Sequence, residues 1–178
     1  MRRQSDRELA EERFRDVFAH LGAVTAYARR RGSADADAIA AETMTIAWRR
    51  LADVPADDSL PWLYATARNL LLAEWRRSAR RTRLSEPEAV APAPELHELD
   101  PELDRAVRAL GPVDREALLL VAWEDLTPAQ AAKALGVNAA TFRVRLLRAR
   151  RRLRSRLEAA SLDALGTGQP VPIDVEGA

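Results

Sequence analysis

The sequence predicts an all-α protein made of two small helical domains joined by an acidic, proline-rich linker. Three observations predict this class: apolar residues recur at three- and four-residue steps, no stretch alternates like a strand or forms a glycine-rich phosphate loop, and 178 residues can hold two small cores. We expect domains at residues 1–84 and 101–160, a linker at 85–100 and a flexible tail at 161–178.

The first domain is expected to contain three helices. Apolar periodicity over residues 7–31 predicts one amphipathic helix that ends at Gly32. A second helix is expected from about residue 35 to Leu51. Its apolar arc, which includes Trp48 and is expected to face the core, covers about half the circumference. The narrow polar strip that remains is either ordinary solvent exposure or a protein-docking edge. The strip consists of Glu42, Thr45 and Arg49.

Residues 52–60 are predicted to form a loop, and a third helix is expected from near Pro61 to about Arg83. Tyr64, Arg68 and Trp75 share one face of this helix, within about 40° of one another. Aromatic side chains interleaved with arginine suit stacking on unpaired bases. Large aromatic residues on a helix also commonly belong to a core, so both interpretations remain open at this point.

Residues 84–100 contain three prolines, five acidic residues and neither lysine nor arginine. This composition predicts an extended acidic linker. A fourth helix is expected to begin at Pro101. Gly111 and Pro112 are expected to end it and to begin a fifth, strongly apolar helix at the centre of the second domain.

The sequence after that helix predicts a helix-turn-helix. Thr127 followed by Pro128 and Gln130 is the pattern of a capping box at the start of a short helix. Gly136 can adopt the left-handed conformation that ends a helix, and Asn138 is expected to cap the next one. A short helix, a glycine turn and an arginine-rich second helix are typical of DNA-binding helix-turn-helix units.

The second helix of this motif has two opposed faces. Its core face is apolar, from Phe142 through Leu146 and Ala149. On the opposite face, arginines surround Val144 and Leu147, two apolar residues that have no core to enter. Arginine bonds guanine edges bidentately and apolar side chains contact thymine methyl groups, so the pattern predicts a base-contacting face. A solvated basic surface is the alternative.

The charge distribution agrees with a polyanionic partner, although the net charge is only +1. Residues 1–83 carry 16 arginines and 12 acidic residues, residues 84–136 carry 4 basic and 11 acidic residues, and residues 137–160 carry 8 arginines and one acidic residue. A basic, acidic, basic layout is typical of a chain that grips a polyanion at two places, with a repelled segment between them.

Composition also narrows the classes of function. The chain has no cysteine, which excludes disulfides and cysteine zinc sites. It has no apolar run of membrane-spanning length and no signal-peptide pattern, so we expect a cytoplasmic protein without membrane insertion. His20 and His97, the two histidines, have no partners at ligand spacing. We therefore expect no metal, no cofactor and no catalytic residue; an enzyme with a DNA-binding tail has no site to support it.

Three segments, in order, resemble the extracytoplasmic-function group of bacterial sigma-70 factors. The second-region helix of that family is similar to DADAIAAETMTIAW at residues 35–48, and its following helix is similar to LPWLYATARNLLLAEWRR at residues 60–77. The fourth region resembles LGPVDREALLLVAWEDLTPAQAAKALGVNAATFRVRLLRARRRL at residues 110–153. The resemblance covers residues 10–84 and 101–158, and three ordered segments are more specific than the helix-turn-helix alone.

The resemblance implies a factor without chemistry of its own that binds core RNA polymerase, recognises a promoter and helps to open it. The strip Glu42, Thr45 and Arg49 would dock on the clamp coiled coil of the largest polymerase subunit, and an anti-sigma factor is a further expected partner. Candidate residues for the minus-ten element are Asp57, Asp58, Ser59, Arg68, Asn69, Trp75, Arg76 and Arg77. Candidate residues for the minus-thirty-five element are Asn138, Thr141, Arg143, Val144, Leu147, Arg148 and Arg151.

Some positions depart from the family pattern. Val144 stands where many members carry a small polar residue, and Ala41 and Met44 replace the usual glutamine and phenylalanine. The promoter sequence therefore does not follow from the resemblance. A stand-alone helix-turn-helix regulator is the alternative function; residues 127–156 support it, but it leaves residues 35–83 unexplained.

Overall fold

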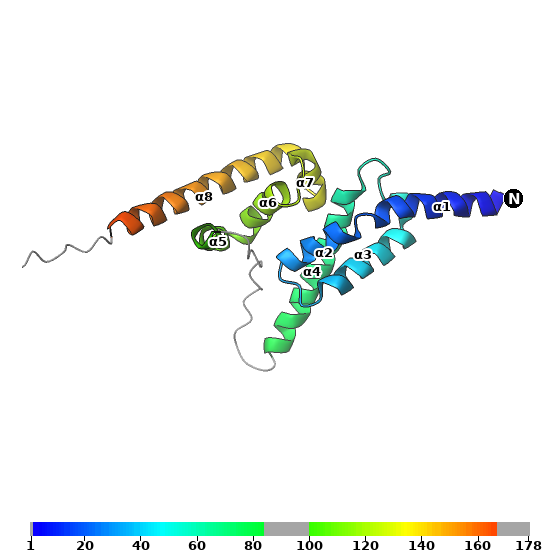
Figure 1. The fold of residues 1–178 in the computed structure, drawn as a ribbon, viewed down its shortest axis with the longest axis horizontal. Helices are drawn as coiled ribbons and strands as arrows, with labels where there is room; N and C mark the ends of the chain where they lie inside the picture. The colour runs from blue at the N-terminus through cyan, green and yellow to red at the C-terminus, as the bar shows by residue number, and fades with distance from the viewer. Residues whose placement is uncertain (1, 84–99, 167–178) are drawn as a thin grey trace, which may run out of the picture.

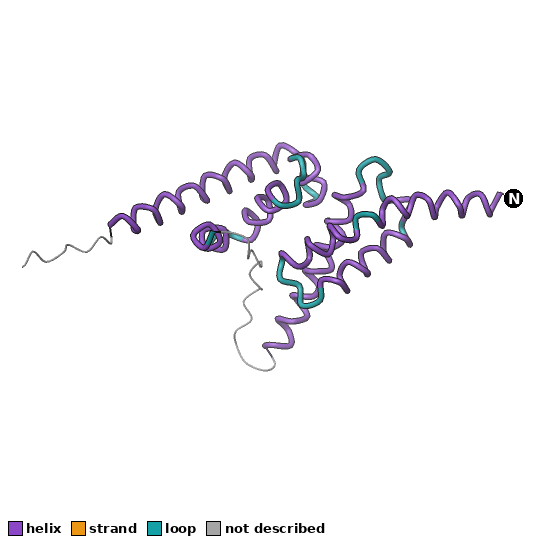
Figure 2. The backbone as a smooth tube through the Cα atoms, viewed as in Figure 1, coloured by secondary structure: helices purple, strands orange, loops and turns teal. Residues whose placement is uncertain are grey.

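The computed structural model describes residues 2–83 and 100–166, and every regular element in these ranges is helical (Figures 1 and 2). The predicted all-α class is confirmed. The first unit consists of α1 Arg2–Phe18, α2 Leu21–Arg30, α3 Ala36–Arg49, the 3-10 turn η1 Leu51–Asp53 and α4 Ser59–Arg83. The second unit consists of α5 Pro101–Arg108, α6 Pro112–Ala122, α7 Pro128–Leu135 and α8 Ala139–Gly166. The predicted linker, apart from residue 100, and the predicted tail beyond residue 166 lie outside the described residues.

The first unit is organised around α2, α3 and α4, which bury a shared apolar core. The prediction of one helix over residues 7–31 is wrong, because a turn at Ala19 and His20 separates α1 from α2. The His20 amide donates to the carbonyl of Val17 at 3.1 Å, a tightened turn that ends α1. The N-terminal half of α1 is largely exposed and projects from the unit, whereas α2 is central to it (Figure 1).

The predicted loop before α4 is shorter than expected, because η1 and the first turn of α4 occupy both of its ends. At the opposite end of the unit, Glu74 of α4 accepts hydrogen bonds from the Ser33 hydroxyl at 3.0 Å and the Ala34 amide at 3.1 Å. These bonds tie α4 to the turn between α2 and α3. The position of α4 relative to both neighbouring helices is therefore fixed.

The second unit is a helix-turn-helix, as predicted. The Thr127 and Gln130 capping box is formed at the start of α7, and Gly136 ends that helix with a φ of 65°. The Asn138 side chain accepts a hydrogen bond from the Thr141 amide at 2.7 Å, which confirms its capping role. The predicted start of the tail at residue 161 is wrong, because α8 continues to Gly166.

The two units pack directly against each other. The start of α4 lies beside α7, and α6 faces the C-terminal end of α2 (Figure 1). The contact combines apolar side chains with ion pairs. It decides which of the predicted DNA-binding residues are accessible.

Candidate nucleic-acid interface

The predicted base-contacting face of α8 is open to solvent. Val144 and Leu147 are 48% and 51% exposed, although both are large apolar residues. The arginines around them are also exposed, and they form no ion pair with any other described residue. These arginines are Arg143, Arg148 and Arg151. Unpaired guanidinium groups around two exposed apolar side chains are suited to the major groove.

The rest of α8 holds this face in place. Phe142 and Ala149 are fully buried, and Leu146 is nearly so, as their spacing predicted. Arg152 of α8 forms an ion pair with Asp114, a buried residue in the first turn of α6. Sequence reasoning missed this pair, because every arginine of α8 has the same appearance in the sequence until its neighbours in space are known.

The predicted minus-ten loop is occupied by contacts with the second unit. Asp58 accepts a hydrogen bond from Gln130 Nε2 at 2.8 Å and forms an ion pair with Lys133, whose Nζ lies 2.9 Å from Asp58 Oδ2. The hydrogen bond from Lys133, opposed in part by burial, holds the pKa of the Asp58 carboxyl below its usual range. Ser59 is buried at 9% exposure, whereas Asp57 is exposed. In this arrangement α7 holds Asp58 away from any base.

The predicted nucleic-acid face of α4 contains buried, half-buried and exposed residues. Tyr64 is 2% exposed and stacks on Tyr27, with ring centroids 4.6 Å apart, so its core interpretation is the correct one. Burial raises the pKa of the Tyr64 hydroxyl. Arg68 and Trp75 are half-buried and line a cavity between the units. The remaining candidates on α4 are exposed: Asn69, Arg76 and Arg77.

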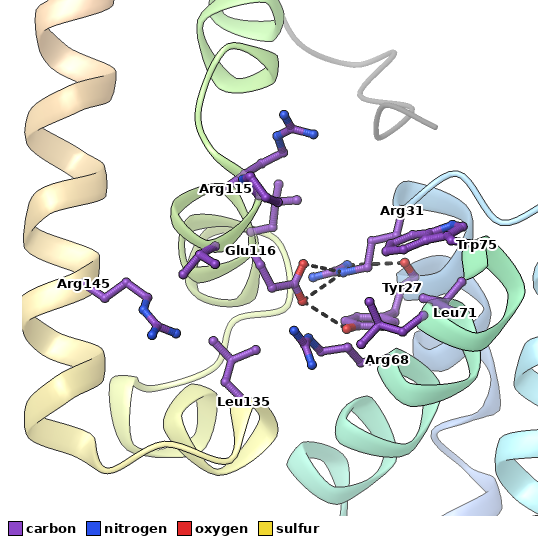
Figure 3. Close-up of a pocket in the computed structure, with 13 residues that line it drawn as sticks. Tyr27, Arg31, Arg68, Leu71, Trp75, Arg115, Glu116, Leu135 and Arg145 are labelled. Atoms are coloured by element: carbon purple, nitrogen blue, oxygen red, sulfur yellow. Dashed lines mark hydrogen bonds and ion pairs between the residues drawn. The ribbon is translucent and has the colours of Figure 1, made fainter. Parts of the chain in front are cut away.

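A buried cluster of charges joins the units, and sequence reasoning missed it. We call Arg30, Arg31, Glu116 and Glu124 the inter-unit ion cluster. Arg31 is 4% exposed, and its Nε lies 3.0 Å from Glu116 Oε2 (Figure 3). Its Nη1 lies 2.8 Å from Glu124 Oε1. Arg30 forms a second ion pair with Glu124. A signal was present in the sequence, since a basic first unit is followed by an acidic segment.

Tyr27 completes the cluster on the side of the first unit. The Tyr27 hydroxyl donates to Glu116 Oε1 at 3.0 Å, and the Arg31 guanidinium lies 3.5 Å from the centroid of the Tyr27 ring. Burial raises the pKa of the Tyr27 hydroxyl, which keeps it a donor. Glu116 and Glu124 are thereby paired with groups of the other unit.

The predicted docking strip on α3 lies outside the contact between the units. Glu42 and Arg49 are exposed, and Thr45 is half-buried, with its hydroxyl bonded to the Ala41 carbonyl. Trp48 was expected in the core, but it is 46% exposed and packs edge-on against Phe14. This surface is available to another protein in the arrangement observed.

No group of side chains suited to a metal ion occurs among the described residues. In the same ranges, no helix is long and apolar enough to cross a membrane.

The fold and the surfaces define a two-unit helical protein with a helix-turn-helix and an exposed basic helix face. Comparison with known proteins agrees with this class. Residues 101–153, which contain the helix-turn-helix, match the family described as sigma-70, region 4. The chain is 37% identical over 159 residues to the probable RNA polymerase sigma factor RfaY of Xanthomonas campestris pv. campestris, an alignment that covers 80% of this chain.

A second relative is the RNA polymerase sigma-E factor of Streptomyces antibioticus, 41% identical over 59 residues, or 33% of this chain. The matches span only 40% of the length of RfaY and 33% of the length of the sigma-E factor. The curated relatives are thus considerably longer than the part that this chain matches.

Solved structures resemble both units of the fold. The sigma factor RpoE in its complex with the anti-sigma factor NepR, from Bartonella quintana, gives a TM-score of 0.61 at 25% identity and covers 81% of this chain and 95% of its own. CnrH, in complex with the cytosolic domain of CnrY, gives 0.59 at 25% identity and covers 86% and 97%. Residues 101–153 thus match the sigma-70 family, and the chain as a whole is similar to sigma factors of the extracytoplasmic-function group.

Proposed function

We propose that this chain is an alternative sigma factor, which binds core RNA polymerase, recognises a specific class of promoter and assists its opening. The observation that carries the proposal is the combination of an exposed base-contacting face on α8 with a separate helical unit that carries candidates for strand binding. Similarity to RfaY over 80% of the chain, which a helix-turn-helix alone would not produce, supports the same function.

Each unit has a proposed role. Val144, Leu147 and Arg148 would read the minus-thirty-five element, with the neighbouring arginines of α8 on phosphates. The strip Glu42, Thr45 and Arg49 would dock on the clamp coiled coil of the largest polymerase subunit. The minus-ten candidates on the 57–59 loop and α4 would hold the non-template strand, at a cost of a few kcal/mol for each extruded base.

Promoter opening would require the two units to separate. Asp58 is held by α7, and Arg68 and Trp75 face the second unit, so a DNA strand has no access to them in the observed arrangement. An anti-sigma factor is a proposed partner as well, because both structural relatives are sigma factors and RpoE is bound to one.

Transcription with purified core polymerase tests the proposal. The chain together with core polymerase is expected to produce promoter-specific transcripts from genomic templates, and Arg49→Glu is expected to lower polymerase binding without altering the affinity for duplex DNA. A matched control is Arg29→Glu, which changes another exposed arginine of the first unit. Tight, sequence-specific binding to duplex DNA by the chain alone, with no binding to core polymerase, would instead support a stand-alone regulator.

A further inference from the structure

A cavity of about 350 Å³ lies between the two units, at the edge of the inter-unit ion cluster (Figure 3). Its walls come from α2 and α4 on one side and from α6, α7 and α8 on the other. Leu71, Leu72, Leu119 and Leu135 supply much of the apolar wall. This volume falls at the lower end of the range for small-molecule pockets, and boundaries between structural units are common places for them.

Two residues that line the cavity, Arg31 and Trp75, carry hydrogen-bond donors without acceptors. Arg31 Nη2 and Trp75 Nε1 are both buried, and neither has a hydrogen-bond partner among the described residues. Arg31 itself is 96% buried, given its 4% exposure. Buried donors in folded proteins are nearly always paired, so the hydrogen bonding beside the cavity is incomplete in this arrangement.

Charge at the cavity is also unbalanced. Four arginines line it, and Glu116 is the single acidic residue among the lining residues. Glu116 is already bonded to Tyr27 and Arg31, and Arg115 is used by the carbonyls at the end of α5. Arg68 of α4 and Arg145 of α8 form no ion pair with a described residue, and both extend toward the space between the units (Figure 3).

We propose that this cavity binds a small organic anion with an apolar body, such as an aryl or alkyl carboxylate, sulfonate or phosphate ester. The anionic group would accept hydrogen bonds from Arg68 and Arg145, and the apolar body would lie against the leucines and Trp75. Arginine is suited to such anions because its planar donors pair with two oxygens at once. A cavity of this volume between the two units suits a small anion rather than a nucleic-acid strand.

Such a ligand would stabilise the closed arrangement of the units. It would contact α4 and α8 together, and a ligand favours the conformation in which its contacts coexist. Arg68 and Trp75 would then remain unavailable to promoter DNA. The site thus adds a small-molecule control to the proposed sigma factor, but anion binding can be measured on the free chain and does not depend on polymerase.

The probe for the experiment is 1-anilinonaphthalene-8-sulfonate, which joins an aromatic body to one sulfonate group and fluoresces when it binds. The full chain is titrated with it, alongside the double variant Arg68→Gln/Arg145→Gln. We expect about tenfold weaker binding by the variant, the loss typical of charge-assisted hydrogen bonds. The matched control, Arg80→Gln/Arg156→Gln, changes exposed arginines on the same two helices and is expected to bind as the unaltered chain does.

Competition experiments distinguish a specific site from non-specific binding of the probe. Phenyl phosphate is expected to displace the probe, and benzyl alcohol at the same concentration is not. Melting temperatures of all chains are compared, because this probe also binds partly unfolded proteins. Equal affinity in the double variant and its control, or equal displacement by the neutral competitor, would overturn the proposal.

Discussion

The two candidate DNA surfaces of this chain differ in what covers them. On α8, Val144 and Leu147 are exposed and the surrounding arginines are unpaired within the described residues. On the first unit, Asp58 is bonded to α7, and Arg68 lines the cavity between the units. One surface can meet duplex DNA as the chain stands, and the other first requires the units to separate. The contact between the units therefore controls the proposed strand-binding step.

The largest effect on this difference between the two surfaces is expected from removal of the inter-unit ion cluster. In Glu116→Gln/Glu124→Gln, Arg31 would lose both of its carboxylate partners while it stays buried, which costs about 3–5 kcal/mol for a broken buried pair. Separation of the units returns Arg31 to water, so we expect the two units to move apart while each of them stays folded. The chain has no cysteine, so Ala38→Cys and Ser155→Cys, both at exposed positions, accept spin labels selectively. Pulsed electron paramagnetic resonance should give longer distances between the two labels in the Glu116→Gln/Glu124→Gln variant than in the labelled parent chain.

The control for this measurement is Glu12→Gln/Glu158→Gln, which removes two exposed carboxylates with the same change in net charge. Its label distances should equal those of the labelled parent chain. An unchanged distance in the Glu116→Gln/Glu124→Gln variant would mean that the cluster does not hold the units together.

On the exposed base-contacting face of α8, the variant Arg148→Ala tests whether this arginine contributes to promoter preference. A bidentate contact to a base contributes about 1–3 kcal/mol of discrimination, so the variant should lose preference for its promoter over altered sequences. Competition binding with polymerase holoenzyme measures that preference. Arg156→Ala changes an exposed arginine of α8 outside the base-contacting face and should leave the preference intact. A uniform loss on all sequences would identify Arg148 as a phosphate contact.

The smallest effect is expected at the loop. The Lys133 amine is largely exposed, so its ion pair with Asp58 should contribute no more than about 1 kcal/mol to closure. The Asp58 pKa is lowered in the closed arrangement, so this contribution is present above the ordinary carboxyl range and is lost as the pH falls through the lowered pKa. In a carbon-13 NMR titration, Lys133→Ala should raise the Asp58 pKa. A Glu12→Gln chain is the control, and an Asp58 pKa unaffected by Lys133→Ala would argue against the ion pair.

Local signals in the sequence predicted local structure well. The capping box at Thr127, the left-handed Gly136 and the buried side of α8 all follow from the chemistry of a few neighbouring residues. The break at Ala19 and His20 was missed, because no proline marks it and the apolar period continues across it. The tail was predicted too early, since the composition beyond α8 gave no sharp stop.

Contacts between the units could not be predicted in the same way. Charge counts showed a basic first unit and an acidic segment after it, but we interpreted that segment as repelled by a polyanion. Two of its carboxylates, Glu116 and Glu124, are instead paired with Arg30 and Arg31. Pairing between residues more than 80 positions apart depends on how the helices pack, and periodicity within one helix contains no such information.

The most direct test compares the label pair at Ala38→Cys and Ser155→Cys in the free chain and in its complex with core polymerase and promoter DNA. We expect one population of short distances in the free chain and a longer population in the complex, because strand binding needs Asp58 and Arg68 uncovered. The complex must produce transcripts under the same conditions, so that an inactive sample is not measured. An active complex with the same short distances as the free chain would show that the units do not separate when promoter DNA is bound.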